Sequence, residues 1–142
     1  MATKENRTKV EARLREAELR LTPQRFAVLE YLTRAAGHPT ADQIAAELNR
    51  RHPRASRATV YNTLGALREA GLVREVVHEA VTRYESNIEQ HHHFVCRACG
   101  KIEDVPPGAL PTPAHVTLEG GHEVEKVEVT LRGLCGACKR KG

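Results

Sequence analysis

The chain has 142 residues, of which 40% are hydrophobic, 28% are charged and 4% are aromatic, and its formal net charge is +4. This length fits one domain or two small ones, and the few aromatic residues, with no Trp, argue against a stacking surface for single-stranded nucleic acid. No apolar run approaches the roughly 20 residues that span a bilayer, and the N-terminus lacks the apolar stretch of a secretion signal, so we expect a cytoplasmic protein with no membrane partner and reduced thiols.

The charge is distributed unevenly along the chain. Residues 1–84 contain 15 Lys and Arg against 10 Asp and Glu, whereas residues 85–142 contain 7 against 8. All four Cys and five of the eight His lie in the second part. This division indicates an anion-binding first part and a metal-binding second part, with an ordinary solvated surface as the alternative for the first.

Apolar residues at helical spacing predict three helices in the first third of the chain. The first covers residues 9–20. The second begins at Pro23, because proline is favoured in the first turn of a helix. The third opens at Thr40, which with Gln43 has the form of a capping box. A basic turn over residues 50–54 follows.

A fourth helix is predicted from Ser56, its N-cap, to Gly71 at its C-terminal end. One face is apolar and the other carries polar side chains and a glycine. The basic turn before this helix favours DNA binding over a merely solvated face, since Arg contacts phosphates and guanine edges. Arg20 is a separate candidate for a groove or phosphate contact. The residues on the polar face are Arg57, Tyr61, Asn62, Gly65 and Arg68.

Two β-rich runs, Leu72–Val77 and Val81–Tyr84, follow the helices and flank a turn. Helices followed by such a hairpin are typical of a winged helix-turn-helix domain. We therefore predict a DNA-binding domain over residues 1–84, a connector over residues 85–92 and a metal-binding domain over residues 93–142.

The predicted second domain is built from short strands. His93–Val95 and Ile102–Val105 flank a cysteine turn, and alternating apolar residues predict another strand over 127–131. The proline-rich segment 106–121 leaves room only for a short helix, and the basic tail 139–141 is expected to fray.

The four cysteines form two CxxC knuckles, Cys96 to Cys99 and Cys135 to Cys138, which are separated by 35 residues. Two such turns supply the four thiolates that tetrahedral Zn²⁺ prefers, and an all-sulfur site has no open position for chemistry. Neither knuckle opens an obvious helix, and a thioredoxin-like motif would be a single CxxC. Structural zinc is the favoured interpretation, with redox thiols or disulfides as the alternative.

A histidine run, His91 to His93, precedes the first knuckle. In an extended segment His91 and His93 point to the same side and His92 to the other. Two imidazoles with nearby carboxylates suit Fe²⁺, Mn²⁺ or Zn²⁺, whereas isolated His are more often solvated or hydrogen-bonded in a core. The spacing leaves these two interpretations balanced. The carboxylates close in sequence are Glu85, Glu103 and Asp104.

Five short motifs occur in order along the chain: Leu21-Thr-Pro-Gln-Arg25, His38-Pro-Thr-Ala-Asp42, Ala58-Thr-Val-Tyr-Asn62, Gly71-Leu-Val73 and His91-His-His-Phe-Val-Cys-Arg-Ala-Cys-Gly100. Together they resemble the ferric uptake regulator family. The resemblance runs from about residue 10 to Cys138. It implies a homodimeric, metal-dependent transcriptional repressor that binds palindromic double-stranded operator DNA. It also implies an α+β fold, with an N-terminal winged-helix domain and a small C-terminal α/β dimerisation domain that carries a four-cysteine zinc site.

The resemblance also implies roles for individual residues. Arg57 and Tyr61 match recognition-helix positions, and Arg20 matches a position that reaches the minor groove. Metal bound at the domain junction would fix the angle between the two winged helices of a dimer, which is a population shift driven by differential affinity. The structural zinc ligands would be Cys96, Cys99, Cys135 and Cys138. The regulatory Fe²⁺ or Mn²⁺ ligands would be His38, Glu85, His91, His93 and Asp104.

Within the family, these motifs are most similar to the peroxide-responsive repressors. There, Fe²⁺ and hydrogen peroxide oxidise a ligand histidine, which here would be His38 or His91. This chemistry modifies the protein itself, so we do not expect an enzyme. The alternatives are an iron-responsive regulator, a manganese or zinc sensor, a general zinc-ribbon interaction module and, from another class, a zinc-stabilised thiol oxidoreductase.

Three features depart from the family pattern. Position 85 is Glu, where peroxide-responsive members usually have Asp and iron-sensing members more often have Glu. Gln90 and His92 depart from an additional histidine-carboxylate site, so we predict no third metal site. Segment 106–121 departs from the helix that usually supports the dimer, which would then rely on the sheet around Val127–Leu131.

Overall fold

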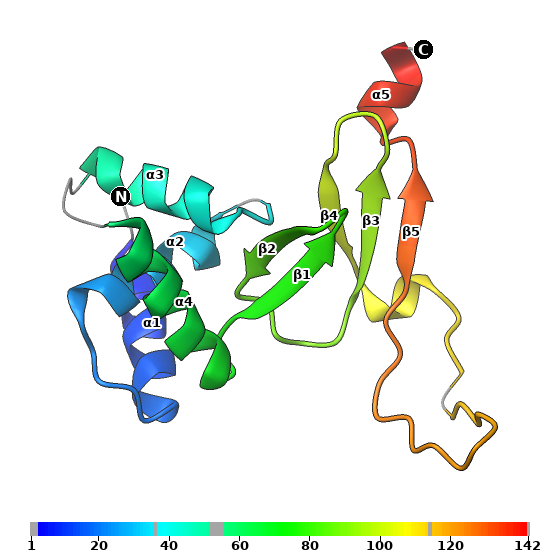
Figure 1. Ribbon diagram of the computed structural model, residues 1–142, viewed down its shortest axis with the longest axis horizontal. Helices are drawn as coiled ribbons and strands as arrows, with labels where there is room; N and C mark the ends of the chain where they lie inside the picture. The colour runs from blue at the N-terminus through cyan, green and yellow to red at the C-terminus, as the bar shows by residue number, and fades with distance from the viewer. Residues whose placement is uncertain (1–2, 36, 52–55, 114, 142) are drawn as a thin grey trace. The chain divides into compact units, whose positions relative to one another are not determined.

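A computed structural model of the protein describes residues 3–35, 37–51, 56–113 and 115–141. The chain divides into two compact units, Met1–Ile88 and Glu89–Gly142 (Figure 1), and the division falls inside the segment predicted to be a connector. None of the described helices is long and apolar enough to cross a membrane. Most of the predicted basic turn, residues 52–54, lies outside the described residues.

The N-terminal unit contains four helices whose starts are set by side-chain caps. Thr22 Oγ1 accepts a hydrogen bond from the Arg25 N–H at 3.2 Å, and Ser56 Oγ accepts one from the Thr59 N–H at 3.1 Å. The predicted capping box at the start of the third helix is present, with reciprocal bonds of 2.9 and 3.1 Å. The helices are α1 (Lys4–Glu16), α2 (Pro23–Arg34), α3 (Ala41–Arg51) and α4 (Arg57–Glu69).

The predicted bounds of the first helix are wrong by several residues. The helix starts early because Thr3 caps it, accepting a hydrogen bond from the Asn6 N–H at 3.2 Å. It ends early because Glu18 takes a left-handed conformation with a φ of 59°. The apolar pattern did not indicate this start, because the first buried residue of the helix is Val10, six residues after its beginning at Lys4.

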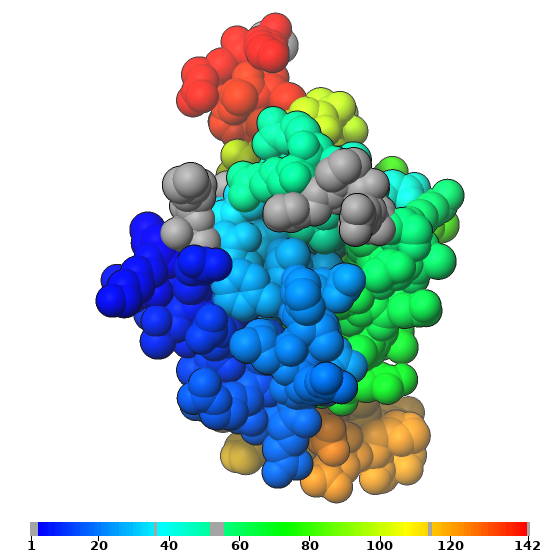
Figure 2. Space-filling view, turned by 90° about the vertical axis from the view of Figure 1, so that its left-hand side faces the viewer, coloured from blue at the N-terminus to red at the C-terminus, as the bar shows by residue number. Residues whose placement is uncertain are grey.

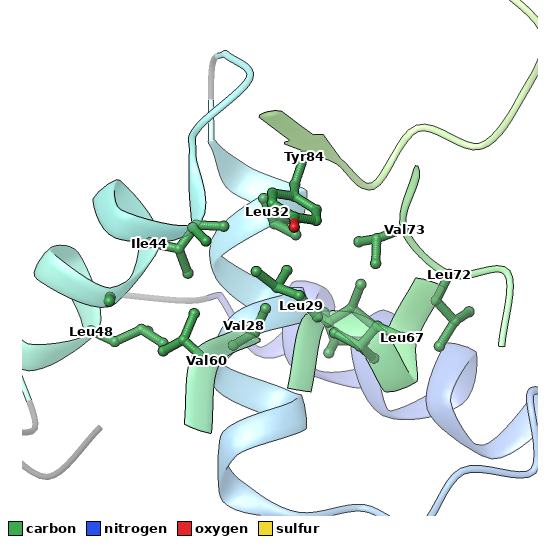
Figure 3. Close-up of a cluster of buried hydrophobic side chains, with 14 of the residues drawn as sticks. Val28, Leu29, Leu32, Ile44, Leu48, Val60, Leu67, Leu72, Val73 and Tyr84 are labelled. Carbon is green, nitrogen blue, oxygen red and sulfur yellow. The ribbon is translucent and has the colours of Figure 1, made fainter. Parts of the chain in front are cut away.

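The hydrophobic core of the N-terminal unit lies among its four helices and the start of the hairpin (Figure 3). Leu29 of α2 is completely buried, and Ile44 of α3 and Leu67 of α4 are equally inaccessible. Each such side chain contributes about 1.5–3 kcal/mol of hydrophobic stabilisation. The space-filling view shows α1 in dark blue and α2 in lighter blue side by side across one face of this unit (Figure 2). The core therefore fixes α4 with its polar face outward.

A two-stranded hairpin completes the N-terminal unit. Strands β1 (Arg74–His78) and β2 (Val81–Glu85) are antiparallel and pair Arg74 with Glu85. The turn residues Glu79 and Ala80 have φ values of 50° and 62°, the conformation of a two-residue hairpin turn. The first strand was predicted to begin at Leu72, but this residue is buried in the helical core and its N–H donates to the Leu67 carbonyl.

The C-terminal unit is built on a three-stranded sheet with the order β4-β3-β5 (Figure 1). Strand β3 pairs antiparallel with β4 and parallel with β5. The last strand begins three residues later than predicted, and the basic tail is helical instead of frayed. The elements are β3 (His92–Cys96), β4 (Ile102–Val105), the 3-10 helix η1 (Pro107–Ala109), β5 (Thr130–Gly133) and α5 (Gly136–Lys141).

Candidate metal centres and nucleic-acid interface

The four cysteine sulfurs of the C-terminal unit form one cluster. Their Sγ atoms all lie within 4.8 Å of one another, and those of Cys99 and Cys135 are 3.8 Å apart. Four Zn–S bonds of about 2.3 Å in a tetrahedron would place neighbouring sulfurs about 3.8 Å apart. The donors and their spacing therefore fit one structural zinc ion and favour a single four-sulfur site over two separate dithiols. Two ligands come from the end of β3 and the turn after it, and two come from the start of α5 and the residue just before it: Cys96, Cys99, Cys135 and Cys138.

Backbone N–H groups favour the negatively charged thiolate form of two of these cysteines. The N–H groups of Cys99 and Cys135 point at the Cys96 sulfur and lower the pKa of its thiol to about 6. The N–H of Cys138 likewise lowers the pKa of Cys135. The Cys138 thiol hydrogen-bonds to the sulfur of Cys135 and, with smaller effects, to those of Cys99 and Cys96. These bonds raise the pKa of Cys138 to about 12. The backbone therefore favours the thiolate form at Cys96 and Cys135, and a bound dication would favour it at the other sulfurs as well.

Three candidate metal ligands meet on one side of the C-terminal sheet. His93 is directly opposite Asp104 in the ladder, and the Nε2 atoms of His91 and His93 are 3.1 Å apart. Asp104 Oδ1 lies 3.2 Å from the first of these nitrogens and 3.6 Å from the second. Ligand bonds of about 2.1 Å at right angles would separate two donor atoms by about 3 Å. These three side chains fit one divalent ion.

His91 is oriented by the backbone that precedes it. Its Nδ1 lies 2.6 Å from the carbonyl oxygen of Glu89, so Nδ1 carries the proton and donates to this oxygen. The other ring nitrogen, Nε2, then faces His93 and Asp104 with its lone pair. Metal-binding histidines are held by the same kind of outer hydrogen bond.

His92 has a different role from its two neighbours. It is 1% exposed, and its Nδ1 accepts a hydrogen bond of 2.9 Å from the N–H of Val129, immediately before β5. The alternation of the strand thus places two imidazoles on the side of Asp104 and one on the opposite side, and all three side chains are buried. His92 connects the central strand to the segment that leads into its parallel neighbour.

Replacing His92 with Ala is expected to lower the free energy of unfolding by about 2–4 kcal/mol, because it opens a cavity and leaves the Val129 N–H unpaired. Chemical denaturation of the zinc-loaded protein measures this loss. His115→Ala is the matched control, since His115 is exposed in the same unit. An unfolding midpoint equal to that of the control would contradict the structural role of His92.

In the N-terminal unit, His38 is brought to Glu85 by the pairing of its loop with β2. The Tyr84 N–H donates to the Pro39 carbonyl at 2.9 Å, and Arg83 Nη1 donates to the His38 carbonyl at 3.0 Å. His38 Nε2 lies 2.8 Å from Glu85 Oε2, and both side chains are 5% exposed. A buried imidazole and a buried carboxylate at this separation also fit two ligands of one divalent ion.

Arg74 contacts the same carboxylate and was not identified from the sequence. It faces Glu85 across the hairpin, and its Nε lies 3.1 Å from Glu85 Oε1. A two-residue turn at Glu79 and Ala80 fixes the hairpin register and so pairs Arg74 with Glu85. Identifying that turn from the sequence would have predicted this contact. The predicted strands ended at Val77 and Tyr84, which left Glu85 outside the hairpin.

The five predicted regulatory ligands are divided between the two units. His38 and Glu85 belong to the N-terminal unit, and the other three belong to the C-terminal unit. Their assembly into one site stays a prediction. Glu103, the remaining carboxylate in the neighbourhood, forms an exposed ion pair with Lys101 instead.

The α4 helix presents the predicted DNA-contact residues to solvent. Arg57 forms an ion pair of 2.8 Å with Asp42, and its guanidinium lies 5.6 Å from the centre of the Tyr61 ring. Arg68 forms an ion pair of 2.8 Å with Glu75. Exposed pairs contribute only about 0–1 kcal/mol, so phosphates can replace these carboxylates at little cost. Four predicted residues are exposed on α4: Arg57, Tyr61, Asn62 and Arg68.

Arg20 lies in the turn before α2 and is exposed. Its carbonyl oxygen accepts a hydrogen bond of 2.8 Å from Arg25 Nη1, which orders this turn while the Arg20 side chain extends outward. The position is compatible with the predicted contact to DNA, which stays a prediction.

Comparisons with known proteins agree over nearly the whole chain. The model of the ferric uptake regulator family matches residues 16–132. The chain is 41% identical over 133 residues to the peroxide operon regulator of Bacillus subtilis strain 168, and the match covers 90% of each chain. The structure of PerR from Streptococcus pyogenes is 34% identical, with a TM-score of 0.53, and the match covers 94% of this chain and 92% of that one.

A further solved structure, a zinc uptake regulator in complex with zinc and DNA, is 25% identical with a TM-score of 0.71, covering 99% of this chain and 97% of that one. The predicted α+β fold class, with helices first, a small sheet second and a four-cysteine cluster at the end, is confirmed. Because both the family model and the relatives match far more than half of the sequence, the chain belongs to the ferric uptake regulator family.

Proposed function

We propose that this protein is a metal-dependent DNA-binding repressor of transcription whose operator binding responds to peroxide. The observation that carries the proposal is the pair of histidine-carboxylate clusters, one in each unit. Each cluster alone offers an ion only two or three donors. A divalent ion that takes donors from both units would be bound best when the units are held in one arrangement.

The two units have separate tasks in this proposal. Residues 1–84 bind double-stranded palindromic DNA through the exposed face of α4, with Arg20 as an outlying contact, and residues 93–142 form the homodimer. Residues 85–92 connect them. The protein acts in the cytoplasm, where its zinc-bound thiols stay reduced.

The regulatory ion is Fe²⁺ or Mn²⁺, because imidazole and carboxylate donors suit these ions. Its ligands are two residues of the N-terminal unit and three of the C-terminal unit. Since DNA binding requires both recognition helices of a dimer to reach successive major grooves, an ion that favours one arrangement of the units raises operator affinity. The ligands are His38, Glu85, His91, His93 and Asp104.

Peroxide sensitivity follows from the kind of ligand that the ion would have. Hydrogen peroxide would be the two-electron oxidant, and Fe²⁺ held by these ligands would mediate the electron transfer next to them. One peroxide oxygen would insert into a ring C–H bond of His38 or His91 and the other would leave as water, which would weaken that ring as a donor and lower operator affinity. The reaction does not regenerate the modified histidine, so each protein molecule reacts once. The protein is therefore a regulator and not an enzyme.

An iron-responsive regulator is the second candidate, and the identity of residue 85 favours it. A Glu in place of the usual Asp changes the reach of the carboxylate, and here it is held between His38 and Arg74. Such a site would bind Fe²⁺ reversibly, and its histidines would survive peroxide. Both candidates share the same fold, ligands and operator binding.

Fluorescence anisotropy with palindromic operator DNA tests the proposal. Binding is expected to tighten by about 100-fold or more when Fe²⁺ or Mn²⁺ is added to the zinc-loaded protein. Hydrogen peroxide should abolish the Fe²⁺ effect but spare the Mn²⁺ effect, with one added oxygen atom in the peptide that contains His38 or His91 by mass spectrometry.

Two outcomes separate the candidates. Unmodified histidine peptides with retained DNA binding after peroxide would favour iron sensing. Operator binding that does not depend on either metal would contradict the switch in both forms.

A further inference from the structure

Arg74 forms an ion pair with the carboxylate of Glu85 from the opposite strand of the β1–β2 hairpin. The two residues are register partners, and Arg74 Nε lies 3.1 Å from Oε1 of Glu85. The arginine side chain is 19% exposed and the glutamate side chain 5%. A buried carboxylate needs a partner of opposite charge to remain ionised, and this arginine supplies it within the same unit.

The second oxygen of the same carboxylate faces His38. Oε2 lies 2.8 Å from His38 Nε2, so the two oxygens of Glu85 have different neighbours. A glutamate has one more rotatable bond than an aspartate, and its carboxylate therefore needs more restraint to stay in one orientation. The planar, directional donors of an arginine can provide such restraint, whereas a lysine ammonium is a point charge on a flexible stem.

We propose that Arg74 is a positioning residue of the regulatory metal site. It engages Oε1 of Glu85, so that Oε2, the oxygen beside His38, is the one presented to the ion. The longer glutamate thereby acts as a one-oxygen ligand in a fixed position, as a shorter aspartate would. This inference rests on the proposed function, because it assumes that Glu85 binds the regulatory ion.

Mn²⁺ binding to the full-length, zinc-loaded protein tests the role of Arg74 without DNA. Arg74→Lys keeps the charge but loses the planar donor group, and we expect it to weaken Mn²⁺ affinity by about 10–100-fold. Calorimetry gives the affinity, and the Mn²⁺ electron paramagnetic resonance spectrum reports the changed ligand arrangement. The control is Arg50→Lys, because Arg50 forms a 2.7 Å pair with Glu47 within α3 and is not close in sequence to any proposed ligand.

A double-mutant cycle distinguishes positioning from general stability. In a Glu85→Gln background, Arg74→Lys should have no further effect on Mn²⁺ affinity, since its target carboxylate is gone. An unchanged affinity for Arg74→Lys, or an equal loss in the Glu85→Gln background, would overturn the inference. Failure of the wild-type protein to bind Mn²⁺ would instead overturn the proposed function.

Discussion

Replacing Cys135 with Ser is expected to release the zinc ion and unfold Glu89–Gly142, while Met1–Ile88 keeps its helical core. The C-terminal unit has little else to hold it together. Among the described residues, its buried apolar side chains are those of Val95 and Ile102, along with two of the cysteines themselves. Structural zinc contributes about 10–16 kcal/mol of binding free energy in small domains, which far exceeds what two such side chains supply.

The N-terminal unit should survive the loss of zinc because its stability has a different source. Among the described residues, its core contains fifteen buried side chains, all of them from the N-terminal unit. Zinc content by elemental analysis and amide NMR of the full chain would measure the two effects together. We expect dispersed signals for the helices and collapsed signals for residues 89–142.

Ala137→Ser is the matched control for Cys135→Ser. It introduces the same side chain at an exposed position of the same knuckle without removing a ligand. One zinc ion per chain and a dispersed spectrum are expected for the control. If Cys135→Ser also retained one zinc ion and a folded C-terminal unit, the four-sulfur site would not be the main stabilising element there.

Local signals in the sequence predicted the parts of the fold that local interactions determine. The predicted N-cap Ser56 marks the start of α4, because its Oγ accepts a hydrogen bond from the backbone N–H three residues later. The strand alternation correctly placed His92 on the side opposite its two neighbours, since side chains in a strand alternate between its faces. The two CxxC knuckles predicted the cysteine cluster, because together they supply the four sulfur donors that one zinc ion prefers.

The features that the sequence did not reveal depend on contacts distant along the chain. The last strand begins at Thr130, where it starts to pair with β3, although the apolar alternation begins earlier at Val127. The helical tail is another example, because Cys138 lies in a helix that the cysteine cluster tethers. The contact between Arg74 and Glu85 required the exact register of the hairpin, which a one-residue error at either strand end conceals.

Replacing His91 with Ala is expected to abolish the metal dependence of operator binding, a loss of about 100-fold or more in affinity at saturating Mn²⁺, while one zinc ion per chain is retained. The substitution removes a nitrogen donor whose ring is oriented by a hydrogen bond from Nδ1 to the backbone carbonyl of Glu89. The site then lacks the His91 Nε2 donor, which lies 3.1 Å from His93 Nε2 and 3.2 Å from Asp104 Oδ1. Anisotropy with operator DNA measures the affinity, and elemental analysis measures the zinc.

His92→Ala provides the sharpest contrast, because the two histidines are adjacent in sequence but face opposite sides of β3. The His91 variant should stay folded and lose its response to Mn²⁺, although removing this buried side chain costs some stability. The His92 variant should be destabilised more, because it also leaves the Val129 N–H unpaired, but it should keep its response to Mn²⁺ under conditions where it is folded. His122→Ala, at an exposed position, should change neither property. If the His91 variant unfolds like the His92 variant, His91 is structural, and the metal-facing side of the strand has been assigned incorrectly.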